Sequence, residues 1–90
     1  MTERSLQITF RKGHAFAAYL YLSHAPGERS ARSVASDDGL LVVDYAADGL
    51  PIGIEITAPD ALSRERLNAT LERLGEPPLP EPEFRPLTAA

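Results

Sequence analysis

The sequence predicts an α+β fold: an antiparallel β-hairpin meander of about five strands with one C-terminal helix packed on the sheet. Segments of the first two thirds of the chain are apolar or alternate apolar and polar residues with a period of two, the pattern of strands buried on one face. Glycine-containing turns separate these segments, as in β-hairpins. After Ile56 the apolar residues recur at helical spacing instead.

The first hairpin is expected at the N-terminus. Residues 6–10 alternate apolar and polar residues, and residues 15–22 form an aromatic-rich apolar run of strand length. Lys12-Gly13 supplies a short turn between them. These two segments therefore read as paired strands.

The second strand of this hairpin should carry two different faces. Side chains alternate along a strand, so Phe16, Leu20 and Leu22 are expected on one face. Tyr19 and Tyr21 are expected on the other, where a phenol keeps its hydroxyl hydrated.

Three more strands follow a loop over residues 23–31 that contains Pro26-Gly27. A short strand is expected at residues 32–36. The clearest pair is residues 40–45 and 50–56, because Asp48-Gly49 between them supports the positive φ that hairpin turns require.

The register of this last hairpin depends on its loop length. A four-residue loop pairs Tyr45 with Leu50 and Val43 with Ile52, which produces one continuous apolar face. A three-residue loop shifts the register by one and puts Asp44 on the isoleucine face. We expect the four-residue loop for that reason.

One amphipathic helix is expected at about residues 64–74. Ser63 is a suitable N-cap, and Gly75 suits the left-handed position that ends a helix. The apolar stripe consists of Leu67, Leu71 and Leu74. This stripe needs a sheet face to cover it.

The last residues are rich in proline, at positions 77, 78, 80, 82 and 86. Proline disfavours helix and central strand, so residues 76–90 are expected to form an extended tail beside a single domain at residues 1–75. Three apolar side chains, among them Phe84, suggest that the tail lies along the domain or along a partner.

Composition narrows the function classes. The net charge of -4 disfavours phosphate backbones and anionic lipid, so nucleic acid is a poor partner. The absence of cysteine excludes thiolate nucleophiles, disulfides and thiolate metal sites. A polar N-terminus and the lack of a long apolar run predict a cytoplasmic protein without membrane contact.

No constellation of catalytic or metal-binding residues is apparent, so we expect no enzyme, no cofactor and no metal. His14 and His24 flank the second strand and should lie roughly 33 Å apart. Asp44 and Glu55 share a face in the preferred register but should lie about 13 Å apart, beyond the spacing of paired catalytic carboxylates.

Several segments taken in order resemble the YuzE-like family of small bacterial proteins, a domain of unknown function. They are Ala18-Tyr19-Leu20-Tyr21-Leu22, residues 38–45 with Asp44-Tyr45, Asp48-Gly49, and Ile52-Gly53-Ile54-Glu55-Ile56. The acidic Tyr-Asp stretch typical of the family is replaced here by residues 10–16. The resemblance implies a compact β-rich domain with a terminal helix and no catalytic residues. It also suggests an antitoxin-like role, since some members are suspected of sitting beside small toxins.

The leading hypothesis is a non-catalytic protein–protein interaction module, acting on a protein partner or by self-association. The residues expected to take part are Tyr19, Tyr21, Asp44, Tyr45, Glu55 and Phe84. The alternative is a small-molecule binding protein or minor enzyme that uses the Asp44 and Glu55 face. A third hypothesis, an antitoxin-like regulator, binds DNA through Arg11, Lys12 and the helix arginines.

Overall fold

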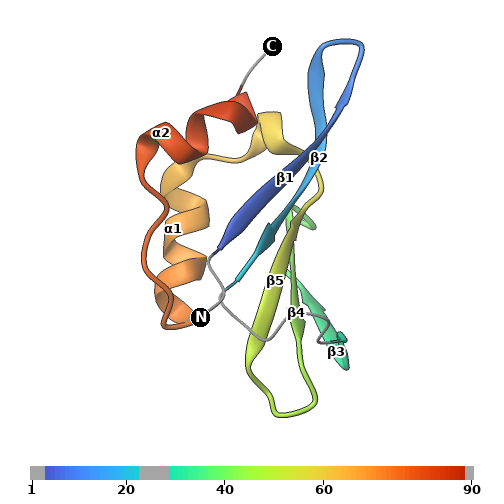
Figure 1. Cartoon of the computed structure of the whole chain (residues 1–90), viewed down its shortest axis with the longest axis vertical. Helices are drawn as coiled ribbons and strands as arrows, with labels where there is room; N and C mark the ends of the chain where they lie inside the picture. Colours follow the sequence, from blue (N-terminus) through green and yellow to red (C-terminus); the bar gives the residue numbers. More distant parts are fainter. Residues whose placement is uncertain (1–3, 23–28, 89–90) are drawn as a thin grey trace.

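A computed structural model describes residues 4–22 and 29–88 and confirms the α+β class. Five antiparallel strands form one sheet (Figure 1). The strands are β1 (Ser5–Arg11), β2 (His14–Tyr21), β3 (Arg32–Ala35), β4 (Leu41–Tyr45) and β5 (Pro51–Ile56). The predicted loop around Pro26-Gly27 falls largely at residues 23–28, outside the described residues.

The strand order is β1-β2-β5-β4-β3, which differs from the simple meander that the sequence predicts. The hairpin β1–β2 and the meander β3–β4–β5 are each formed by consecutive strands. They join where β2 pairs with β5. This pairing is antiparallel and places Leu20 opposite Ile54, more than thirty residues later in the sequence. The central strand of the sheet is therefore β5.

The first hairpin closes as predicted, through Lys12 and Gly13. Both residues have positive φ, of 53° and 81°, as the favoured two-residue hairpin turn requires. Phe16, however, does not share a face with the buried leucines. A bulge offsets the ladder here, with Thr9 opposite Ala17 and Phe10 opposite Ala15. Phe16 is 50% exposed beneath the guanidinium of Arg11.

At the loop, the β4–β5 register follows the three-residue alternative. The loop has three residues, because the N–H of Ala46 bonds to the carbonyl of Leu50 and Tyr45 lies opposite Pro51. A bulge then falls between these pairs and the next, which places Asp44 opposite Gly53. The predicted pairings of Tyr45 with Leu50 and of Val43 with Ile52 are both wrong, since Val43 lies opposite Ile54. The bulge nevertheless reverses the exchange of faces that a one-residue shift would cause.

Among the described residues, four helical segments follow the sheet instead of one. They are η1 (Pro59–Ala61), α1 (Arg64–Arg73), α2 (Glu81–Phe84) and η2 (Arg85–Thr88). The first turn of α1 is capped as predicted: the Ser63 hydroxyl accepts the N–H of Arg66 at 3.1 Å. Gly75 follows this helix with a φ of 78°.

The proline-rich segment is not the extended tail that its composition predicts. Pro82 lies in the first turn of α2, where a helix does not need the missing N–H. Leu79, Phe84 and Leu87 are all buried, with at most 6% of the side chain exposed. Residues 79–87 therefore contribute to the same hydrophobic core as the strands.

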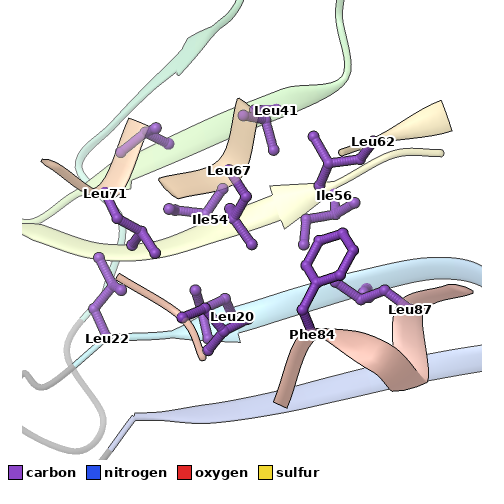
Figure 2. Close-up of a cluster of buried hydrophobic side chains, with 13 residues drawn as sticks. Leu20, Leu22, Leu41, Ile54, Ile56, Leu62, Leu67, Leu71, Phe84 and Leu87 are labelled. Carbon is purple, nitrogen blue, oxygen red and sulfur yellow. The ribbon is translucent and has the colours of Figure 1, made fainter. Parts of the chain in front are cut away.

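The helices lie on one side of the sheet (Figure 1), and the core lies between the two layers. Figure 2 shows strand leucines and isoleucines facing side chains of α1, α2 and η2. The fully buried residues include Leu20, Leu41, Ile54, Ile56, Leu67, Leu71 and Leu87. None of the helices described is long and apolar enough to cross a membrane.

Leu87→Ala is expected to lower the free energy of unfolding by about 2–5 kcal/mol, because it leaves a cavity in a close-packed core. Urea unfolding followed by circular dichroism measures this change. Leu50→Ala, at a side chain that is 55% exposed, is the control and should have little effect. Equal effects of the two changes would contradict the placement of Leu87 in the core.

Candidate functional site

None of the described helices covers the second face of the sheet (Figure 1), and we call it the open face. Because side chains alternate along each strand, the residues opposite the core point to this side. At its centre, the pairing of β2 with β5 and of β5 with β4 determines which side chains are neighbours. The open face is formed by Gln7, Tyr19, Tyr21, Ser33, Val42, Asp44, Gly53 and Glu55.

Asp44 is the centre of a hydrogen-bond chain that crosses this face. The Tyr19 hydroxyl donates to Oδ2 of Asp44 at 2.7 Å, and the Ser33 hydroxyl donates to Oδ1 at 2.5 Å. Bonds from neutral hydroxyls to an ionised acceptor are short and strong. The chain therefore ties β2, β4 and β3 together across the open face.

Gly53 makes room for the Tyr19 side chain. Tyr19 lies opposite Glu55, whereas Asp44 lies opposite Gly53. The Tyr19 ring must therefore cross over Gly53 to reach Asp44. A Cβ at Gly53 would overlap the hydroxyl and the ring of Tyr19. A glycine inside a strand often marks such a close approach.

The pKa of the Tyr19 hydroxyl is raised well above its usual value. Burial of the phenol is the main cause, because it disfavours the charged form. The hydrogen bond to Asp44 and the negative charges of Asp44 and Glu55 act in the same direction. Tyr19 is therefore a neutral hydrogen-bond donor near pH 7 and is not poised to act as a base.

Tyr21 supplies the exposed aromatic surface of the open face. Its ring lies 4.6 Å from that of Tyr19, centroid to centroid, at an angle of 59°. The Tyr21 side chain is 42% exposed. Its hydroxyl lies 3.4 Å from Oε1 of Gln7, at the long limit of a hydrogen bond. Tyr19 thus supports a neighbouring ring that remains accessible.

The two carboxylates of the open face are closer than the sequence predicts. Asp44 lies opposite Gly53, so Glu55 is two positions along β5 instead of four. Diagonal neighbours of this kind are about 7–8 Å apart, not 13 Å. Both oxygens of Asp44 already accept hydrogen bonds. The side chain of Glu55 is exposed and makes no hydrogen bond or ion pair with any other described residue.

Two of the predicted interaction residues lie elsewhere. Tyr45 is half-buried against the core, and the guanidinium of Arg32 lies 4.4 Å above its ring. Phe84 is buried among the core side chains (Figure 2). The structure thus brings Tyr19, Tyr21, Asp44 and Glu55 onto one face and separates the other two from it.

Sequence reasoning missed Ser33 and Gly53. Ser33 is one of many serines, and only the pairing of β3 with β4 sets it opposite Asp44. Gly53 did carry a signal, since a glycine between two isoleucines in a strand points to a close contact.

The described residues include no group of three or more side chains placed to hold a metal ion. Of the two histidines considered in this context, His24 lies outside the described residues. None of three cavities lined by described residues includes Tyr19, Asp44 or Glu55 in its lining.

No family model, curated protein or solved structure matches this chain. The resemblance to the YuzE-like family therefore stays a prediction.

Gly53→Ala is expected to lower the free energy of unfolding by about 1–3 kcal/mol, because the new methyl group displaces the Tyr19 ring. In a Tyr19→Ala background the same change should cost little. Urea unfolding of the four proteins of this double-mutant cycle measures the coupling. An equal cost in both backgrounds would show that the ring does not lie across Gly53.

The raised pKa of Tyr19 predicts a late step in an alkaline titration. The neutral hydroxyl stabilises the fold fully below the ordinary tyrosine pKa of about 10, and this stability is lost as the pH rises toward the pKa of the folded state. Tyrosinate absorbance, with circular dichroism as the monitor of folding, should show a late component. Tyr19→Phe should abolish it and Tyr21→Phe should keep it; a late component that survives Tyr19→Phe would refute the assignment.

Proposed function

We propose that the chain is a non-catalytic protein–protein interaction module whose open face contacts the partner. The observation that carries this proposal is the exposed Tyr21 ring, held against Tyr19 and thereby against Asp44. Tyrosines are enriched at protein interfaces, because they offer a large contact area at a small cost in side-chain entropy. An antitoxin-like role, in which the partner is a toxin, is one form of this function.

The shape of the open face supports a protein partner. A small-molecule site is normally a concave cavity that buries most of its ligand. The cavities described above lie away from Tyr19 and Glu55. Two carboxylates also make this face a poor surface for phosphate backbones, which argues against DNA binding here.

A second candidate, a small-molecule binding protein or minor enzyme, gains support from one observation. The observed register brings Asp44 and Glu55 into the range of separations that paired catalytic carboxylates use. The Tyr19 hydroxyl occupies one oxygen of Asp44, however, and the Ser33 hydroxyl occupies the other. We therefore rank this candidate second.

Photo-crosslinking in the host cell tests the proposed function. A benzophenone amino acid replaces Tyr21, and in a matched protein it replaces Leu50, which is exposed at the β4–β5 loop. We expect a discrete protein adduct, either a partner or a second copy of the chain, only from position 21. The replacement keeps an aromatic ring at position 21.

The adduct should disappear when Glu55→Lys is added to the position-21 protein, because this change reverses the charge beside the rings. Adducts from both positions, or from neither, would refute the open face as the contact surface. Sedimentation of the purified chain separates the two forms of the proposal, since only self-association raises its mass.

A further inference from the structure

A second surface lies at the edge of the sheet that β3 forms. Among the described residues β3 pairs with β4 alone, and its four residues are all exposed. The N–H of Ser36 bonds to the carbonyl of Leu41, and hydrogen-bonded pairs alternate along an antiparallel ladder. The backbone groups of Val34 therefore face β4, and those of Ser33 and Ala35 face away from the sheet.

A cavity of about 410 Å³ adjoins this edge on the helix side of the sheet. Its apolar floor comes from Leu41, Val43 and Tyr45, and α1 contributes Arg73 to the opposite wall. Val34 of the edge strand also lines it and is 43% exposed. An apolar side chain placed beside Val34 would be partly removed from water here.

The charged side chains at this groove favour an anionic occupant. Arg32 lies over Tyr45, and Arg73 forms no ion pair with any other described residue. Asp37 is the one carboxylate in the lining. The groove is thus locally cationic in a chain whose net charge is -4, and guanidinium groups suit carboxylates.

The opposite edge of the sheet, formed by β1, differs because its arginine is already hydrogen-bonded. Beside β1, the guanidinium of Arg4 donates hydrogen bonds to the carbonyls of Pro77 and Pro78. That arginine is engaged with the C-terminal segment of the chain itself. The groove beside β3 therefore combines a strand edge that no other described strand pairs with and cationic side chains that form no ion pair with a described residue.

We propose that the β3 edge and this groove bind an extended acidic segment of a partner protein, which adds to the sheet as a sixth strand. The backbone of the segment pairs with Ser33 and Ala35. Arg32 and Val34 lie two residues apart on the groove side of β3, so the segment carries an acidic and an apolar side chain two positions apart, about 6.6 Å along the strand. This site is separate from the open face of the proposed function.

Titration of the ¹⁵N-labelled chain with synthetic eight-residue peptides tests this proposal. A peptide that repeats Val-Val-Glu-Glu, and so carries valine and glutamate two positions apart on each face of a strand, is expected to shift the amide signals of Ser33, Val34 and Ala35. A peptide that repeats Val-Val-Lys-Lys, which has the same backbone and apolar residues, should not. Shifts that appear with both peptides, with neither at millimolar concentration, or at Tyr21 and Glu55 instead would overturn the proposal.

Two variants locate the contacts. Ala35→Pro removes an N–H that points away from β4, which an edge strand tolerates, and should weaken binding about two- to tenfold. Arg73→Gln should weaken it a few-fold and reduce its dependence on salt. Arg64→Gln, the same change at the other end of α1, is the control and should leave binding unchanged.

Arg73→Gln decides the outcome if Ala35→Pro fails to fold. Equal affinities of Arg73→Gln and Arg64→Gln would overturn the role of the groove. A concentration-dependent dimer in which the signals of β3 shift without peptide would also overturn it, because the occupant of the edge would then be a second copy of the chain.

Discussion

The pairing of β2 with β5 is the constraint on which the rest of the molecule depends. It joins an N-terminal hairpin to a meander that begins after the residues 23–28, and it turns two small units into one sheet. On the helix side it sets Leu20 beside Ile54, which are both buried in the core. On the other side it places Tyr19 beside Glu55 and brings the Tyr19 hydroxyl within hydrogen-bond distance of Asp44. A short chain has little apolar surface to bury, so one long-range pairing serves both the core and the candidate site.

Local sequence signals predicted the elements that depend on near neighbours. The turn at Lys12-Gly13, the Asp48-Gly49 hairpin and the Ser63 cap each follow from the chemistry of a few adjacent residues. The strand order did not follow, because period-two patterns show which face of a strand is buried but not which strand lies beside it. The bulge at Ile52, directly after Pro51, was only partly predictable. Its effect on the register depends on the loop geometry, although proline inside a strand is a known signal for irregular pairing.

The candidate site shows the same division between local and long-range information. Alternation correctly placed Tyr19 with Tyr21. Asp44 shares a face with Glu55 because the bulge offsets the one-residue shift of the three-residue loop. The distance between the carboxylates depended on the register and was wrong. Phe84 was assigned to a tail because five prolines outweighed three apolar residues in that reasoning. Proline in the first turn of a helix does not destabilise it, because the missing N–H has no partner there. The three apolar residues are part of the core.

β3 borders both surfaces, and this links them physically. Among the described residues, this four-residue strand has a ladder on one side only, so its side chains must supply further contacts that hold it in place. On the groove side Arg32 lies over Tyr45, and on the open face Ser33 donates to Asp44. A segment that pairs with β3 would restrict the backbone of Ser33 and thereby the position of Asp44, which in turn holds the Tyr19 hydroxyl. With the edge occupied, the open face would lose less conformational entropy when it binds its own partner. The two surfaces, on opposite sides of one strand, would therefore bind cooperatively without any change of fold.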